Sequence, residues 1–125
     1  MKPKKIILSD YSEYALWNIT DKISAKINNE KILSILLDIR DEYAVEKAFS
    51  INQPDIVLHA AALKHVPICE NHPLDAIKTN ILGTKVIAEN AIKFKTKIMA
   101  IISTDKAVDP SSFMGASKRA AEIYI

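Results

Sequence analysis

Glycine is scarce in this chain: among its 125 residues, only Gly83 and Gly115 are glycines. Glycine-rich turns bring backbone N–H groups and a helix N-terminus close to a phosphate, because a residue without a side chain lets the backbone approach the anion. Two glycines so far apart in the sequence cannot form such a turn. The chain therefore lacks the loop that usually holds the phosphates of a bound nucleotide.

Cysteine is rarer still, and arginine is as scarce as glycine. The single cysteine, Cys69, excludes an internal disulfide bond and is typical of a protein kept in a reducing cytoplasm. Only Arg40 and Arg119 among the 17 basic residues are arginines, so few side chains could bind a phosphate in a bidentate manner. We therefore expect a cytoplasmic protein that has little arginine-based phosphate recognition.

Clustered charge and long apolar runs are also missing. The 17 basic and 15 acidic residues are scattered and leave a net charge of +2, so no nucleic-acid-binding surface is expected. No segment approaches the roughly 20 apolar residues of a membrane span. The basic N-terminal run ends at Ser9, too early for the core of a signal peptide. The sequence predicts no membrane segment.

Apolar runs of strand length alternate with segments of helical periodicity. Four strands are predicted, at residues 5–8, 32–37, 55–59 and 97–102, and their nearly continuous aliphatic composition suits strands covered on both faces. Helices are predicted at residues 15–27, 44–49 and 73–94, and from Ser112 onward. This order predicts an α/β fold with a doubly wound parallel sheet, formed by a single domain over residues 1–125.

Gly83 interrupts the third predicted helix. Glycine inside a helix costs about 1 kcal/mol relative to alanine. Its presence there indicates either close packing of the backbone or a local break in the helix.

Polar residues follow each predicted strand, at the edge where such sheets bind ligands. Asp10 stands where a dinucleotide-binding fold places a carboxylate for ribose hydroxyls, but Asp10 or Ser12 could equally cap the next helix. Asp38 could accept a hydrogen bond from an adenine amino group. The D-x-x-D pattern that Asp38 forms with Asp41 is also typical of helix capping.

The third strand ends in His-Ala-Ala-Ala. The small residues Ala60, Ala61 and Ala62 would let a flat cofactor or substrate approach the backbone, although small residues also simply pack well. His59 is more typical of a buried histidine with satisfied hydrogen bonds than of a catalytic one.

Lys64 and His65 lie in an irregular segment that Pro67 closes, so they could face a ligand or solvent. The three histidines, His59, His65 and His72, lack the closely spaced companion ligands of a zinc site. No metal site is predicted.

Asp105 and Lys106 form the strongest chemical pair in the sequence. A carboxylic acid beside an amine at the end of a buried strand can act as general acid and general base, because each group shifts the pKa of the other. An exposed turn that leads into Ala-Val-Asp-Pro is the alternative interpretation.

Four motifs follow one another along the chain: H-A-A-A-L-K-H-V-P from His59, T-N-I-L-G-T from Thr79, S-T-D-K-A-V-D-P from Ser103 and M-G-A-S-K from Met114. Together they resemble the extended short-chain dehydrogenase/reductase superfamily. More narrowly, they resemble the CapD-like polysaccharide biosynthesis proteins, the nucleotide-sugar 4,6-dehydratases of bacterial surface-glycan pathways. The resemblance spans nearly the whole chain and is densest over residues 55–123.

The resemblance implies a UDP-N-acetylglucosamine-type substrate and a tightly held NAD(P) that is reduced and reoxidised within one turnover. Asp105 would be the acid that expels the C6 hydroxyl, and Lys106 would be the base at C5. Thr104, or alternatively Ser103, would hold the C4 oxygen. Lys118 would bind the nicotinamide ribose and adjust local pKa values.

The other contacts that the resemblance implies come from the remaining strand ends and one helix. On the cofactor side they are Asp10, Asp38 and Ile39 at the adenosine half, His59, Ala60, Ala61 and Ala62 along the cofactor, Ser103, and Asn80, which would brace the backbone beside it. Lys64 and His65 would contact the substrate.

Met114 departs from the superfamily's Y-x-x-x-K pattern, in which a tyrosine four residues before the lysine loses a proton. A thioether cannot titrate and accepts hydrogen bonds only weakly, so another group must serve as base for the C4 hydroxyl. Some large dehydratases of this group similarly carry methionine here. The departure weakens the case for a nucleotide-sugar 4-epimerase, which is the alternative within the family.

Compared with the family, the chain lacks the first strand with its glycine-rich loop and the sugar-binding region. We therefore expect a partial Rossmann-like sheet whose strands form two separate parallel pairs with exposed edges and apolar faces. A fragment of a split or decayed reading frame would fit this pattern. It would be inactive alone, and either complementing polypeptides from a split gene restore activity or the chain is a non-catalytic remnant or interaction module.

Overall fold

The structure, a computed structural model, describes residues 3–27 and 31–125. The chain divides into two compact units, Met1–Asp38 and Ile39–Ile125.

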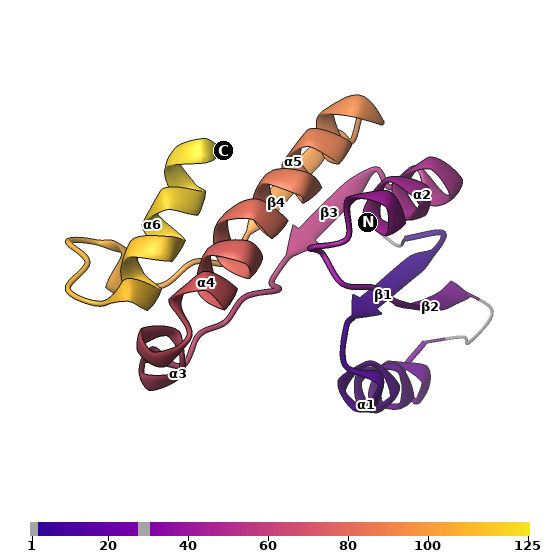
Figure 1. The fold of residues 1–125 in the computed structure, drawn as a ribbon. Helices are drawn as coiled ribbons and strands as arrows, with labels where there is room; N and C mark the ends of the chain where they lie inside the picture. The colour runs from indigo at the N-terminus through magenta and orange to yellow at the C-terminus, as the bar shows by residue number, and fades with distance from the viewer. Residues whose placement is uncertain (1–2, 28–30) are drawn as a thin grey trace. The chain divides into compact units, whose positions relative to one another are not determined.

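The first unit contains one βαβ element (Figure 1). Strand β1 (Ile6–Asp10) leads into helix α1 (Glu13–Ser24), and strand β2 (Ile32–Leu36) pairs with β1 in parallel. The helix begins where the Ser12 hydroxyl accepts a hydrogen bond from the Ala15 N–H at 3.3 Å. Leu16 is a buried residue of this helix. Strand β1 begins one residue later and ends two residues later than predicted, so it ends at Asp10 itself.

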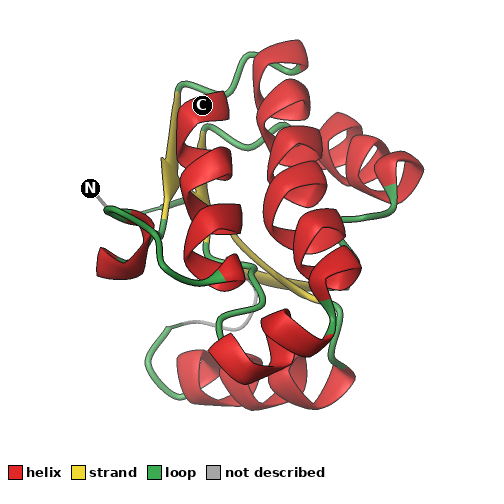
Figure 2. Cartoon of the chain, turned by 60° about the vertical axis from the view of Figure 1, so that its left-hand side comes forward, coloured by secondary structure: helices red, strands yellow, loops and turns green. Residues whose placement is uncertain are grey.

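The second unit begins with helix α2 (Glu42–Asn52) and strand β3 (Ile56–His59). A helical stretch follows, made of α3 (Val66–Asn71), α4 (Pro73–Ala76), the π-helix η2 (Ile77–Gly83) and α5 (Thr84–Lys93). Strand β4 (Ile98–Ile101), a 3₁₀ turn η3 (Asp105–Ala107) and helix α6 (Phe113–Tyr124) complete the unit. Figure 2 shows these helices in red and the strands in yellow.

The four described strands form two separate parallel pairs, β1 with β2 and β3 with β4, as the sequence predicts. The pairing leaves apolar strand residues exposed: Leu58 is 75% exposed, and its neighbours Ile56 and Ile98 are half exposed. The expectation that the strands are covered on both faces is therefore wrong within the described residues. The expectation of exposed apolar faces is confirmed.

The predicted helix at residues 73–94 is three consecutive segments, with the π-helix in the middle. The change from π-helix to α-helix follows Gly83, which is buried: a Cβ added there would lie 2.6 Å from the Ile39 Cδ1 atom. The close packing predicted for Gly83 is therefore confirmed, whereas the helix is not broken there, because Gly83 has helical dihedral angles and η2 continues directly into α5. Helix α3 is not predicted from the sequence, which indicates an irregular segment closed by Pro67. In the structure Pro67 lies in the first turn of α3, where proline is well tolerated.

Candidate functional site

The turn η3 brings Asp105 and Lys106 together, as the sequence predicts. The Thr104 hydroxyl donates to the Asp105 Oδ1 atom at 2.9 Å, and the Lys106 N–H donates to the same atom at 3.0 Å. The Lys106 Nζ lies 3.6 Å from that oxygen. Three donors therefore converge on one oxygen of the carboxylate.

These donors lower the pKa of the Asp105 carboxyl. The Thr104 hydroxyl contributes most, followed by the positive charge and the backbone N–H of Lys106. Asp105 is an exposed carboxylate at neutral pH in this structure. It can act as an acid only after it has taken up a proton at the site.

Asp105 and Lys106 line a pocket of about 340 Å³. Its other lining residues are Val66, Val108, Asp109, Ser111 and Ser112. Asp109 adopts a left-handed backbone conformation, with φ of 52°, which aspartate tolerates better than most residues. Asp109, Ser111 and Ser112 were not predicted as site residues, although the run of alcohols after Asp105 was a signal for them.

Lys118 projects from α6 toward the carboxyl end of β4. Its ammonium donates to the Ile102 carbonyl oxygen at 2.6 Å, and the residue is only 9% exposed. Burial lowers the pKa of the Lys118 ammonium, and the Glu122 carboxylate opposes that shift. The Ser103 hydroxyl bonds to Glu122 and lowers the pKa of that carboxyl.

His59 is a buried histidine with a hydrogen-bond partner, as the residue-level reading expects. Its Nε2 atom lies 2.8 Å from the Thr84 hydroxyl oxygen. Burial, together with the positive charge of Lys118, lowers its pKa to about 4. The ring is therefore neutral at physiological pH.

Asn80 braces the segment that follows β3. Its Oδ1 accepts from the Leu63 N–H at 2.8 Å, and its Nδ2 donates to the Leu63 carbonyl oxygen at 2.9 Å. The same Nδ2 donates to the Ser117 hydroxyl at 2.9 Å, and that hydroxyl donates to the Met114 carbonyl oxygen at 2.7 Å. One buried amide thus connects the π-helix, the loop after β3 and α6.

Met114 lies in the core. It is 3% exposed and packs with Cys69 and Ala76, with Phe113 beside them. It does not line the pocket that contains Asp105 and Lys106. The methionine is therefore a packing residue, and it supplies no proton-transfer group to that pocket.

The remaining predicted contacts of the second unit lie at or near the surface. Ala60, Ala61, Lys64 and His65 are exposed, and Ala62 is half-buried. Ile39 is buried, and the Asp41 carboxylate caps α2 by accepting from the Ala44 N–H at 2.9 Å. No described contact joins Lys64 or His65 to the Asp105 pocket.

In the first unit, Asp10 and Asp38 lie close to the ends of the two strands. The Asp10 Oδ1 accepts from the Ser12 N–H at 2.8 Å, while the Ser12 hydroxyl provides the helix cap. Asp38 is half-buried just after β2. The N-cap residues of α1 and α2 are therefore Ser12 and Asp41.

Within residues 3–27 and 31–125, no three or more histidine, cysteine, aspartate or glutamate side chains are grouped so that they could hold a metal ion. None of the helices in these residues is both long and apolar enough to cross a membrane.

Two curated relatives show which proteins this sequence is similar to. The chain is 40% identical over 124 residues to the capsular polysaccharide biosynthesis protein CapD of Staphylococcus aureus, covering 98% of this chain and 21% of CapD. It is 38% identical over 120 residues to the UDP-glucose 4-epimerase of Rickettsia canadensis, covering 93% of this chain and 35% of the epimerase. The chain thus spans about a fifth to about a third of these relatives.

Solved structures agree on the fold. Pen from Bacillus thuringiensis superposes with a TM-score of 0.88 at 35% identity, over 99% of this chain and 38% of Pen. A dTDP-glucose 4,6-dehydratase from Streptomyces venezuelae, solved with NAD bound, superposes with a TM-score of 0.83 at 18% identity, over 99% of this chain and 42% of the enzyme. The fold is therefore part of a Rossmann-like α/β domain. The family model described as "Polysaccharide biosynthesis protein" matches residues 1–125, and the chain belongs to that family.

Proposed function

We propose that the chain carries the catalytic turn of an NAD(P)-dependent nucleotide-sugar 4,6-dehydratase, with a UDP-N-acetylglucosamine-type substrate. The observation that carries this proposal is the pairing of Asp105 with Lys106, whose charged atoms lie 3.6 Å apart beside a pocket. An acid and a base held together in this way suit a reaction that protonates a leaving hydroxyl and removes the proton on the adjacent carbon.

Each residue of the turn has one part in this proposal. Lys106, as the free amine, removes the C5 proton and later returns it. Asp105 takes up the proton of the C4 hydroxyl through Thr104 and gives it to the C6 hydroxyl, which leaves as water. Thr104 holds the C4 oxygen, because its hydroxyl can still accept a hydrogen bond while it donates to Asp105. When bound, NAD(P) would accept the C4 hydride and return it to C6.

The described residues offer side chains for the two riboses of such a cofactor but none for its pyrophosphate. Lys118 has an ammonium with donors beyond the one used by Ile102, so it can reach ribose hydroxyls, and Asp10 offers a carboxylate at a strand end. The pyrophosphate has no such site, because Gly83 and Gly115 both lie in helices and pack against Ile39 and the Lys106 carbonyl. The phosphate-binding turn would have to come from another segment.

A 4-epimerase is the second candidate, because one relative of similar identity is named as such. The burial of Met114 argues against it: an ordinary epimerase of the superfamily relies on a tyrosine at this position, and here the side chain packs against Cys69 and Ala76. A non-catalytic interaction module is the third candidate. The apolar strand faces around Leu58 support that reading for the chain alone.

Complementation tests these candidates. The chain would be co-expressed with a polypeptide that carries the first strand, the glycine-rich loop and the sugar-binding region of a CapD-like protein, and the soluble complex would be incubated with NAD and UDP-N-acetylglucosamine. We expect loss of water by mass spectrometry, and no product from the chain alone. The Asp105→Asn complex should be slower by about a hundredfold or more, because an amide cannot donate the required proton. A soluble complex that never dehydrates the sugar would contradict the dehydratase assignment.

A further inference from the structure

Helix α6 binds the end of β4 through two side chains that lie one helical turn apart. The Lys118 ammonium donates to the Ile102 carbonyl oxygen at 2.6 Å, and the Glu122 carboxylate accepts a hydrogen bond from the Ser103 hydroxyl. Ile102 and Ser103 stand just before the turn η3 in the chain. Lys118 is a proposed cofactor contact, whereas Glu122 has no part in the proposed sugar chemistry.

The Glu122 carboxylate joins the helix to the end of the strand. Its side chain is 25% exposed, and the Arg119 guanidinium donates to its Oε2 atom at 3.0 Å. The Ser103 hydroxyl and the Arg119 guanidinium both lower the pKa of the Glu122 carboxyl, and Ser103 has the larger effect. Glu122 is therefore a carboxylate at neutral pH. Its pair with Arg119 lies within one helix, but its bond to Ser103 connects two elements.

This bond decides how the Ser103 hydroxyl can bind a ligand. A carboxylate can only accept, so Ser103 donates its one hydrogen to Glu122 and its oxygen is left as an acceptor. Ser103 is exposed, so a ligand can reach that oxygen. A hydroxyl of a sugar or a ribose therefore fits Ser103 as a donor.

Glu122 also affects the charge of Lys118. Burial lowers the pKa of the Lys118 ammonium, and the Glu122 carboxylate opposes that shift. His59 of β3 is coupled to the same ammonium, but its ring has a pKa of about 4 and is neutral, so it adds no charge. Glu122 therefore favours the charged form of Lys118 at a position where burial disfavours it.

Other charged groups on the elements packed against α6 have partners of their own. Carboxylates bind the Phe113 N–H from α3, the Thr104 hydroxyl from η3, the Tyr124 hydroxyl from α5 and the Arg40 guanidinium from α4; they belong to Glu70, Asp105, Glu89 and Asp75. The Lys106 ammonium of η3 pairs with Asp105. Glu122 is the carboxylate whose charge acts on Lys118.

We propose that Glu122 is a positioning residue of the dehydratase site: by binding Ser103 one turn from Lys118, it fixes the end of β4 and the ammonium next to the catalytic turn. This role rests on the proposed function, because Lys118 is there the contact of the nicotinamide ribose. Glu122 acts through these two residues and does not itself bind the sugar.

Two pKa measurements by NMR on the full chain test this role without any activity. Glu122→Gln keeps an oxygen that accepts from Ser103 but removes the charge, so the pKa of Lys118, followed at its Cε resonance, should fall below the wild-type value. Ser103→Ala removes the main donor, so the pKa of the Glu122 carboxyl should rise. An unchanged pKa in either variant would overturn the proposal.

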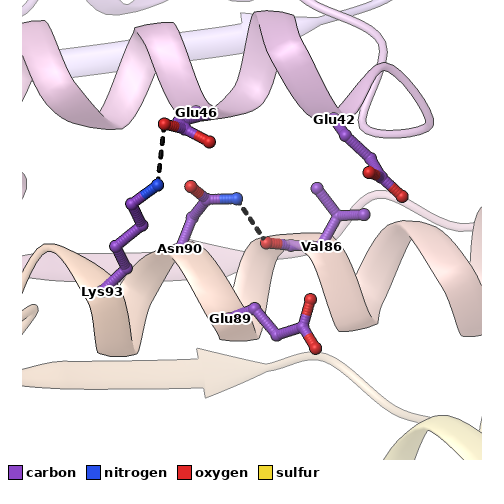
Figure 3. Close-up of a pocket in the computed structure, with 6 residues that line it drawn as sticks. All are labelled: Glu42, Glu46, Val86, Glu89, Asn90 and Lys93. Carbon is purple, nitrogen blue, oxygen red and sulfur yellow. Dashed lines mark hydrogen bonds and ion pairs between the residues drawn. The ribbon is translucent and has the colours of Figure 1, made fainter.

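Two control variants separate this effect from a general loss of charge or of helix stability. Arg119→Gln removes the helical pair of Glu122 but leaves the carboxylate, so the pKa of Lys118 should not fall. Glu46→Gln removes a carboxylate that pairs with Lys93 at 2.7 Å between α2 and α5 (Figure 3), and should leave the pKa of Lys118 unchanged. A fall in either control as large as in Glu122→Gln would contradict the proposal.

NAD binding by the complemented complex tests the consequence for the site. NAD should bind more weakly as the pH rises through the pKa of Lys118, because the ribose then loses a charged donor. This weakening should begin at lower pH in Glu122→Gln, with NAD binding about twofold to fivefold weaker than in wild type in that range. Identical pH dependence in both complexes would overturn the positioning role, even in an active dehydratase. A wild-type complex that binds NAD but leaves the sugar intact would refute the proposed function instead.

Discussion

Asn80 binds both backbone groups of Leu63, one with each end of its amide, at 2.8 and 2.9 Å. The residue is 1% exposed, so water cannot replace these bonds if the amide is lost. Asn80 also lies within the π-helix η2, where a widened helical turn directs the side chain toward the loop after β3. These two bonds, called the Asn80–Leu63 contact below, connect the π-helix to the loop after β3, which the family resemblance places beside the cofactor.

Asn80→Leu should destabilise the chain by about 3 kcal/mol, because it leaves the Leu63 N–H and carbonyl without partners in the interior. Ser117→Ala should cost only about 1 kcal/mol, because it removes one of the three bonds of the amide. Urea unfolding followed by circular dichroism measures both free energies of unfolding. Equal stability of wild type and Asn80→Leu would contradict the claim that the Asn80–Leu63 contact stabilises the fold.

Gly115→Ala should displace the catalytic turn. A Cβ at this position would overlap the Lys106 carbonyl oxygen, which is backbone and cannot move without shifting η3. We expect a cost of about 2 kcal/mol and large chemical-shift changes at Thr104, Asp105 and Lys106. Gly83→Ala is the matched control, because its Cβ would meet the flexible end of the Ile39 side chain. If the control perturbs η3 as strongly as Gly115→Ala, the contact with Lys106 is not the cause.

Met114 should behave as a core residue. Met114→Leu keeps an apolar side chain of similar volume and should cost less than about 1.5 kcal/mol. Met114→Tyr inserts a larger ring and a hydroxyl among Cys69, Ala76 and Phe113, and should cost about 2 to 3 kcal/mol. Thermal unfolding measures the loss of stability in both variants. A tyrosine that is tolerated without loss and titrates at its ordinary pKa would show that this side chain faces the pocket instead.

Stability should fall as the pH is lowered, because His59 is buried neutral. Its pKa of about 4 in the folded chain lies below the ordinary value of 6.5. Between these values the unfolded chain binds more protons than the folded one, so the free energy of unfolding rises with pH across this window. The full effect is about 3 kcal/mol, present above pH 6.5 and lost as the pH falls to 4. His59→Gln should remove this contribution, which urea unfolding at a series of pH values can detect.

The sequence predicts the strands and the paired charges well, because both depend on neighbours in the chain. Continuous runs of Ile, Val and Leu mark the four strands, and Asp105 and Lys106 are adjacent residues. Tertiary contacts determine what was missed. Asn80 in the π-helix bonds to Leu63, 17 residues earlier in the chain, and Met114 is buried against Cys69 of α3.

The pocket at the catalytic turn could be anticipated only in part. Asp109, Ser111 and Ser112 join Asp105 there because α6 folds back over η3, which no periodicity of the sequence reports.

The most direct measurement of the central claim follows the C5 proton. The complemented complex would be incubated with UDP-N-acetylglucosamine in D₂O, and the product would be analysed by NMR and mass spectrometry. If Lys106 removes and returns the C5 proton and Asp105 expels the C6 hydroxyl, the product is a 4-keto-6-deoxy sugar that carries deuterium at C5, and Lys106→Met abolishes it. A C4 epimer without deuterium at C5, or dehydration that survives Lys106→Met, would contradict the account.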